Sequence, residues 1–419
     1  MALPRKAYVI GGHITSFIGK GSPDFIWKGH ADFGKRENAS IEELITTSVR
    51  GALEATGTSA ELVEKAWIGN FVGELFSSQG HLGAALVGAH PGLRGKPVMR
   101  VEGACASGGL AFASAVESIQ AGTDITLVAG VEVQTTASAR TGGDYLARAA
   151  HYKRQRSIDE FTFPALFASR VKAYREAYGL SEEDLGRVSV KAYANANKNP
   201  LAHMKAVKMS LAQAAKASEK NPAFLSNPEL QPYMKVSDCS QVSDGGAALI
   251  LVSEAGLAKL GKSVHDAIEV RGLGVATGDL YVDGDPLRME ITELAAKKAY
   301  AQAGIDARRV GVAEVHDCFT LTELLMYEAL GFARPGEAIE LIKEGRTDIE
   351  GDVATNTGGG LVGFGHPVGA TGVKQILEIW RQMKGRCGDY QIPSAPEIGL
   401  TANMGGNDKT AVVTVLAAC

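Results

Sequence analysis

The chain has 419 residues and a formal net charge of −4, because 43 lysines and arginines are set against 47 aspartates and glutamates. This balance leaves no basic surplus for binding a polyanion, so nucleic acid is not an expected partner. Hydrophobic residues make up 45% of the chain and charged residues 21%, which excludes a disordered protein and indicates a globular one. At this length, two or three structural units are expected.

Glycine and cysteine usage narrows the class further. The 50 glycines are about 12% of the chain against an average of about 7%, which indicates many tight turns or close backbone contacts. The five cysteines are an odd number without Cys-x-x-Cys spacing, so neither a disulfide framework nor a zinc site is expected. No apolar run approaches the ~18 residues of a membrane span, and no signal-peptide pattern is present. We therefore expect a cytoplasmic protein that is not inserted in a membrane.

Strand and helix patterns alternate through the first half of the chain. Ser40 and Glu43 form a capping box that predicts the start of a helix, and Gly57 predicts its end. Apolar periodicity predicts the other elements in chain order: a strand over 6–10, a strand over 66–72, a helix over 108–119 and a strand over 125–130. This order predicts parallel strands joined by helical crossovers.

The second half repeats this pattern. Residues 52–70 align without gaps on residues 299–317, so that Gly57 lies over Gly304. The shared order of helix, glycine and strand indicates either a duplicated α/β unit or two unrelated β-α-β units that share a loose pattern. In a duplicated fold, a pseudo-twofold axis would relate the two halves.

The stretch between the halves differs in character. It contains several prolines and predicts an inserted, mostly helical subdomain with helices over 167–178, 181–196 and 210–218. An apolar strand pattern resumes after Asp244-Gly-Gly246. The predicted division is therefore an N-terminal half of residues 1–134 plus 240–265, an inserted loop domain of residues 135–239 and a C-terminal half of residues 266–419.

Cys105 is the first candidate for covalent chemistry. It lies in Glu102-Gly-Ala-Cys-Ala-Ser-Gly-Gly109, directly before a predicted helix. A helix N-terminus stabilises a thiolate, so we expect the pKa of this thiol to lie below its usual value of about 8.5. The alternative is a small buried residue at a tight turn.

His366 is the second candidate, in a glycine-rich loop from Gly358 to Gly372 that precedes a helix predicted over 373–384. A phosphate-binding loop with an incidental histidine is the alternative, but the P-loop ending and the dinucleotide-binding spacing are both missing. An offset of 261 residues places His366 over Cys105. We therefore expect the two side chains to face each other at corresponding helix starts.

The segment His316-Asp317-Cys318-Phe319 follows a strand predicted over 312–315, and ligand sites in α/β folds form at such strand ends. Successive residues of an extended chain point to opposite faces, so His316 and Cys318 should share a face that excludes Asp317. That arrangement is a weak metal site. One histidine and one cysteine on a common face suit proton transfer and oxyanion donation better.

A fourth segment, Asn403-Met-Gly-Gly406, is predicted to connect a strand over 398–402 to a final strand over 410–416. Its glycine amides are free to face a ligand. Taken alone, the segment also fits a simple hairpin turn.

Together, in this order and spacing, the four segments resemble the thiolase family over essentially the whole chain. The Cys105 segment resembles the family's nucleophile turn, and Gly365-His-Pro-Val-Gly369 resembles its Gly-His-Pro motif. Thiolases usually have Asn-Glu-Ala-Phe where this chain has His316-Asp-Cys-Phe319, and Cys-x-Gly where it has Asn403-Met-Gly405. Both departures indicate similarity to sterol-carrier-protein-type thiolases and archaeal acetoacetyl-CoA thiolases.

The resemblance implies a role for each site residue. Cys105 would accept the acyl group and His366 would take its proton. His316 and His366 would donate to the thioester oxygen that becomes an enolate, while the backbone amides of Cys105 and Gly405 would stabilise the tetrahedral oxyanion. Cys318 would move the α-proton of acetyl-CoA. Coenzyme A thioesters are the expected substrates, with no metal or other cofactor.

The resemblance also implies an α/β thiolase fold of two βαβαβαββ halves stacked as five layers, α-β-α-β-α, with the loop domain covering coenzyme A. A tight homodimer, alone or as a dimer of dimers, is expected. The implied activity is acyl transfer in lipid metabolism, by condensation of acyl-CoA molecules or thiolytic cleavage of 3-ketoacyl-CoA. The alternatives are a thiolase-like retro-aldolase with a small OB-fold partner, which Cys105 argues against, and a non-catalytic scaffold that binds acyl-CoA.

Overall fold

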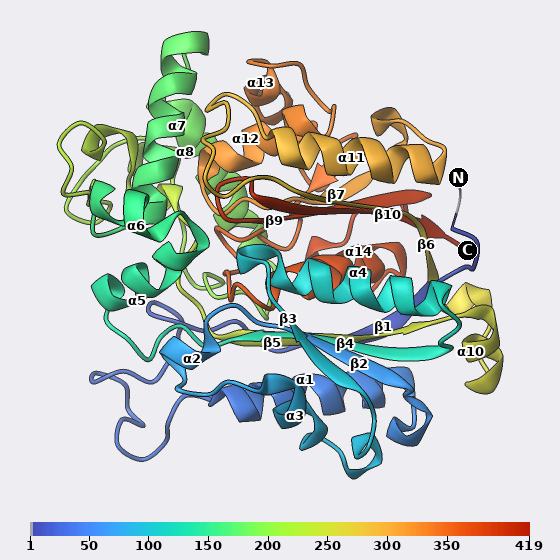
Figure 1. Ribbon diagram of the computed structural model, residues 1–419. Coiled ribbons are helices and arrows are strands. Elements are labelled where there is room, and N and C mark those ends of the chain that lie inside the picture. The colour runs from blue at the N-terminus through green and yellow to red at the C-terminus, as the bar shows by residue number, and fades with distance from the viewer. Residues whose placement is uncertain (1–2) are drawn as a thin grey trace.

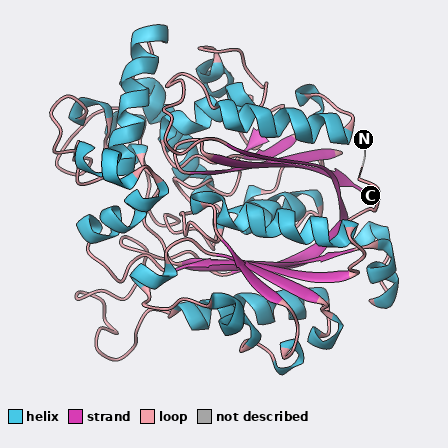
Figure 2. Cartoon of the chain, viewed as in Figure 1, coloured by secondary structure: helices cyan, strands magenta, loops and turns pink. Residues whose placement is uncertain are grey.

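Two five-stranded β-layers, one from each half of the chain, lie face to face in the computed structural model, which describes residues 3–419 (Figure 1). Helices α4 (Ser107–Gln120) and α14 (Thr371–Met383) lie between the layers, and further helices cover both outer faces (Figure 2). The layers are joined where β1 (Tyr8–Ile14) pairs briefly with β6 (Ile268–Thr277). The expected five-layer α/β fold is therefore confirmed.

The first layer has the strand order β3-β2-β4-β5-β1. Its outer face is covered by α1 (Ile41–Thr56) and α3 (Leu82–Val87). β2 is parallel to β3 and β4, whereas β5 is antiparallel to β4 and β1. The bounds of these strands are Lys65–Gly69 for β2, Val98–Val101 for β3, Ile125–Glu132 for β4 and Gly245–Val252 for β5.

The second layer repeats this topology strand for strand, with the order β8-β7-β9-β10-β6. α11 (Glu290–Ala303) and α12 (Thr320–Ala329) cover its outer face, and α13 (Ala338–Lys343) packs on α12. The bounds of the strands are Val312–Glu314 for β7, Ala354–Thr355 for β8, Ile398–Gly405 for β9 and Thr410–Ala418 for β10. The chain is thus built from two copies of one α/β unit.

The sequence alignment of the two halves is confirmed at the level of single residues. α1 begins at the predicted capping box of Ser40 and Glu43. α1 and α11 both end at a glycine in the left-handed region, Gly57 with φ 61° and Gly304 with φ 68°. Glycine is favoured there because a Cβ atom clashes with the backbone in this conformation. The local signals that end a helix therefore identify the duplication correctly.

Residues 135–239 leave the first layer after β4 and return to it at β5, forming helices at one end of the layers (Figure 1). The predicted helix over 167–178 begins earlier, at Thr162, and its first turn includes Pro164, a position where proline is tolerated. No helix within residues 3–419 is long and apolar enough to cross a bilayer. The helices are α5 (Ala139–Leu146), α6 (Tyr152–Gln155), α7 (Thr162–Tyr178), α8 (Glu182–Ala196) and α9 (Leu211–Ala214).

Two strands run further than the predicted ends at residues 10 and 402, in both cases through glycines. β1 continues through Gly12 to Ile14, and β9 continues through Asn403 to Gly405. A Cβ atom on Gly12 would lie 2.1 Å from the carbonyl oxygen of Ala248, and one on Gly405 would lie 2.1 Å from that of Gly103. These glycines therefore allow close backbone packing inside strands.

α14 is buried between the layers and carries a charged residue into the core. Lys374 Nζ lies 2.7 Å from Glu314 Oε2, and the two side chains are 1% and 2% exposed. Burial raises the pKa of Glu314 to about 7, although Lys374 acts in the opposite direction. The pair is costly to break, because removing one partner leaves an uncompensated charge in the core.

We expect Lys374→Met to lower the free energy of unfolding by about 3–5 kcal/mol, measured by urea denaturation at pH 8. The loss should be smaller at pH 5, because protonation of Glu314 relieves the buried charge. Arg309→Met, which removes the exposed Arg309–Glu397 pair, is the matched control and should change stability by less than about 1 kcal/mol. Equal effects of the two substitutions would contradict the prediction.

Candidate active site

Cys105, His316 and His366 meet in one cavity. Cys105 lies in the short 3₁₀ turn η3 (Ala104–Ala106) before α4, His316 follows β7, and His366 lies in the glycine-rich loop before α14. One sulfur or nitrogen atom from each side chain lies within 4.8 Å of those from the other two. The imidazole rings are nearly perpendicular, at 87°, with centroids 5.0 Å apart. The structure therefore brings together the two histidines and the proposed nucleophile.

Cys105 and His366 each precede a central helix of their half, but at different distances from the helix start. α4 begins at Ser107, close after Cys105, whereas α14 begins at Thr371, further along from His366. Cys105 and His366 therefore lie at different distances along the chain from the starts of their helices, and a single offset does not align both the side chains and the helix starts. The two helices meet closely, since a Cβ atom on Gly108 would lie 3.0 Å from the nitrogen of Gly372.

The cavity has a volume of about 420 Å³ and a predominantly apolar lining. Cys318 and Gly406 line it beside the three reactive side chains, and the inserted helices form one wall. An apolar wall with few polar groups is typical of sites that bind an organic ligand and exclude water. The aromatic lining residues are Phe71, Phe161, Phe163, Phe224 and Phe319.

His366 is held in the tautomer of a base. Its Nδ1 lies 2.7 Å from Thr371 Oγ1, and the Thr371 hydroxyl donates to the Pro367 carbonyl oxygen at 3.1 Å. We assign the Thr371 hydroxyl proton to the Pro367 carbonyl oxygen, which leaves Nδ1–H of His366 to donate to Thr371. Nε2 is left with its lone pair and, within the described chain, without a partner. Burial lowers the pKa of His366 to about 3, so the ring is neutral.

The expected low pKa of Cys105 is wrong. Burial raises the pKa of the thiol to about 12, with Glu132 adding to the effect, and the amide of Gly406 offsets it only in part. The sequence shows the nearby helix start but not the loss of water around the sulfur, which destabilises the thiolate. The resting site is therefore a neutral thiol beside a neutral imidazole, and Cys105 needs a base before it can act as a nucleophile.

This raised pKa predicts how Cys105 is alkylated. In His366→Ala, where no neighbouring base can take the thiol proton, we expect its rate of reaction with iodoacetamide to rise about tenfold per pH unit from pH 7 to beyond pH 9, because only the thiolate reacts. A small free thiol of pKa about 8.5 is the control, and its rate should level off near pH 9. The modified Cys105 peptide can be quantified by mass spectrometry. A rate for Cys105 that levels off below pH 8 would contradict the prediction.

Cys318 and Gly406 complete the cavity. Cys318 is 8% exposed, its Sγ lies 3.8 Å from Thr322 Oγ1, and burial together with the Cys105 thiol raises its pKa well above the usual value. Gly406 has φ 66°, and its amide donates to Cys105. The sequence analysis expected the glycine amides of this segment to face a ligand and assigned the oxyanion to Gly405, since which of two adjacent amides faces inward depends on the geometry of the turn.

Asp317 points away from the cavity, as the alternation predicts. Its carboxylate accepts from the amides of Leu361 at 2.7 Å and Val362 at 3.3 Å, so it anchors the glycine-rich loop that carries His366. Glu132, which the sequence analysis missed, is buried at the end of β4 and accepts from the amide of Gly369 at 3.2 Å. A carboxylate at the end of a strand whose one other polar residue is Thr126 was the available signal for it.

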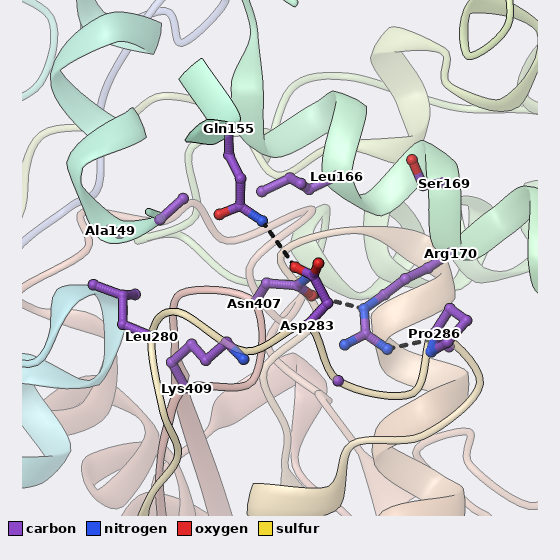
Figure 3. Close-up of a pocket in the computed structure, with 12 residues that line it drawn as sticks. Ala149, Gln155, Leu166, Ser169, Arg170, Leu280, Asp283, Pro286, Asn407 and Lys409 are labelled. Carbon is purple, nitrogen blue, oxygen red and sulfur yellow. Dashed lines mark hydrogen bonds between the residues drawn. The ribbon is translucent and has the colours of Figure 1, made fainter. Parts of the chain in front are cut away.

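A smaller cavity of about 160 Å³ lies next to the turn that follows Gly406 (Figure 3). There, the buried Arg170 donates to Asn407 Oδ1 at 2.7 Å and to the carbonyl oxygens of Asp285 and Pro286 at 3.0 and 2.9 Å. The guanidinium thus ties the β9–β10 turn to a long surface loop. Its contacts support the position of the Gly406 amide.

The same atoms of Cys105, His316 and His366 are close enough to hold a metal ion. A thiol and two imidazoles can also carry out nucleophilic attack and proton transfer without a metal.

Comparison with known proteins gives the site its context. Residues 29–255 match the model for the thiolase N-terminal domain, and residues 274–418 match the thiolase C-terminal domain-like model. The chain is similar to acetyl-CoA acetyltransferases of Methanothermobacter thermautotrophicus (34% identity, 91% of this chain, 96% of the relative) and Methanocaldococcus jannaschii (35%, 93% and 97%). A solved Ltp2-ChsH2(DUF35) aldolase shares the fold, with a TM-score of 0.79 and 22% identity over 100% of this chain and 99% of that one. The chain belongs to the thiolase family.

Proposed function

We propose that the protein is an acetyl-CoA C-acyltransferase, which joins acetyl-CoA to an acyl-CoA or cleaves a 3-ketoacyl-CoA through an acyl-enzyme on Cys105. The observation that carries this proposal is the Cys105 thiol in the same cavity as the unpartnered Nε2 of His366, which we assign as the lone-pair nitrogen. The archaeal relatives, named acetyl-CoA acetyltransferases, support acetyl-CoA as a substrate.

In the first half-reaction, His366 Nε2 takes the proton of Cys105, and the thiolate attacks the thioester carbonyl carbon. The amides of Cys105 and Gly405 are proposed to stabilise the resulting oxyanion, and Gly406 is added because its amide already reaches the sulfur. The C–S bond to coenzyme A then breaks, and the imidazolium returns its proton to the leaving thiolate. The product is an acyl-thioester on Cys105 and free coenzyme A.

In the second half-reaction, Cys318 is proposed to move the α-proton of acetyl-CoA. In cleavage, a neutral Cys318 thiol protonates the enolate carbon, and burial favours this neutral form by raising the pKa. In condensation, Cys318 gives its proton to the neutral His366, and its thiolate takes the α-proton of acetyl-CoA. The enolate carbon then attacks the Cys105 thioester, and the departing Cys105 thiolate recovers the proton from His366. Both directions require hydrogen-bond donors at the enolate oxygen, a role we assign to His316 and, once protonated, to His366.

We propose that residues 135–239 form a loop domain that covers coenzyme A, between an N-terminal half (1–134 plus 240–265) and a C-terminal half (266–419). Leu146, Phe161 and Phe224 of this segment line the cavity.

We also propose a homodimer. β3 is an edge strand of the described sheet, and such an edge presents unpaired backbone groups with which a second copy can pair.

The test is exposure of the protein to acetyl-CoA, followed by intact-mass and peptide analysis. One acetyl group on Cys105, absent from the Cys105→Ala variant, is the expected result. An unmodified wild-type protein that still binds acyl-CoA would overturn the proposal in favour of a scaffold.

A retro-aldolase with a small partner protein is the second candidate, because the similar solved structure is that of an Ltp2-ChsH2(DUF35) aldolase. That likeness, at 22% identity, concerns the fold. The pairing of Cys105 with His366 favours acyl transfer. Full aldol cleavage by a Cys105→Ala variant would reverse this preference.

A further inference from the structure

We propose that Asn403 is a positioning residue that sets the tautomer of His316, so that this imidazole presents an N–H donor to the reacting thioester oxygen and cannot serve as a base. The inference rests on the proposed function for its chemical consequence. Its structural part, the position of one proton, can be tested without any substrate.

The orientation of the Asn403 side-chain amide is fixed by two partners of opposite polarity. Asn403 is buried on β9, its Oδ1 lies 3.0 Å from the backbone nitrogen of Gly109, and its Nδ2 lies 3.1 Å from the carbonyl oxygen of Cys105. A peptide N–H can only donate and a peptide carbonyl can only accept, so the oxygen and nitrogen of the amide cannot be exchanged.

The second proton on Asn403 Nδ2 then determines the protonation of His316. Nδ2 lies 3.3 Å from His316 Nδ1, which must offer its lone pair to this donor. Because burial and the nearby His366 lower the pKa of His316 well below its usual value, the ring is neutral and its single proton lies on Nε2. This buried Nε2–H has no partner within residues 3–419, and His316 lines the cavity.

The two imidazoles of the site are thereby given opposite functions. Thr371 accepts from Nδ1–H of His366 and leaves a lone pair on its Nε2, whereas Asn403 donates to Nδ1 of His316 and leaves a proton on its Nε2. A base requires the first state and an oxyanion donor requires the second. The resting site therefore holds one acceptor and one donor, although both residues are neutral histidines.

The test is Asn403→Asp, which keeps the side-chain shape and an acceptor for the Gly109 amide. The new carboxylate oxygen accepts from His316 Nδ1–H and moves the lone pair to Nε2. We expect formation and cleavage of the carbon–carbon bond to fall by about 10²–10³-fold, the effect of losing one oxyanion donor. Acylation of Cys105 depends on His366 and should change by less than about tenfold.

Nitrogen-15 NMR of histidine-labelled protein gives a readout that a purely structural role would not change. In the wild type, His316 is expected to show a protonated Nε2 and an unprotonated Nδ1, and the two signals should exchange identity in Asn403→Asp. A protonated Nδ1 on His316 in the wild type overturns the inference. This measurement does not depend on whether acetyl-CoA acylates Cys105, so failure of the proposed function would be recognised separately.

A double-mutant cycle with His316→Gln separates the tautomer from other effects of Asn403→Asp, including repulsion between the new carboxylate and the Cys105 carbonyl. A glutamine side chain offers an N–H donor but has no tautomer to be set. We therefore expect Asn403→Asp to cost about 10²–10³-fold when His316 is present but less than about tenfold in the His316→Gln background. Equal losses in both backgrounds would overturn the inference.

Discussion

His366→Ala is expected to slow the acylation of Cys105 by acetyl-CoA by about 10²–10⁴-fold, the usual effect of losing a positioned general base. The physical reason is the resting state of the pair. Burial raises the pKa of the Cys105 thiol to about 12, so almost none of it is thiolate at neutral pH, and His366 Nε2 is the acceptor that the structure places beside it. Single-turnover mass spectrometry of the acetylated protein measures this step directly.

The rate of Cys105 acylation in the His366→Ala variant should also depend on pH. Without the base, hydroxide must supply the thiolate, so the acylation rate should rise about tenfold per pH unit through pH 9. Thr371→Val is the graded control, since it removes the acceptor that fixes the His366 tautomer but leaves the ring in place. Its loss should be smaller than that of His366→Ala. Wild-type acylation rates in His366→Ala would contradict the assignment of the base.

Much of the fold could be predicted from the sequence because its signals are local. The capping box at Ser40, the helix-ending Gly57 and Gly304 and the alternation of strands and helices depend on residues a few positions apart. Glycines caused the errors. The predicted strands stop at residues 10 and 402, but Gly12 and Gly405 allow distant backbones to approach inside longer strands, which no local pattern reveals.

The candidate site divides in the same way. Cys105, His316 and His366 could be named because each lies in a distinctive segment, and the structure brings them into one cavity. Their protonation states could not be predicted, because burial and long-range hydrogen bonds determine them. Asn403 contacts Gly109 and Cys105 across 294 and 298 residues of sequence. The chemistry of each histidine is therefore a property of the packed fold.

Cys318→Ala is expected to separate the two half-reactions. Cys318 lines the cavity and shares a face with His316, but the base for Cys105 is His366, on another loop. Acylation of Cys105 should therefore continue within a few-fold of the wild-type rate, while the carbon–carbon step falls by about 10²–10⁴-fold for want of the group that moves the α-proton. The two rates can be followed as acetyl-enzyme formation and as 3-ketoacyl-CoA formation or loss.

Exchange of the acetyl-CoA α-protons with deuterated solvent provides an independent measure of the same step. Wild-type protein should catalyse this exchange, and Cys318→Ala should not, because removing an α-proton requires a base at Cys318 whether or not a carbon–carbon bond forms. Cys387→Ala is the matched control: this thiol is also buried but lies outside the cavity lining, so both half-reactions should persist. Undiminished exchange in Cys318→Ala would contradict this role for Cys318. The α-proton would then be moved by another group, such as His316 with a lone pair on Nε2.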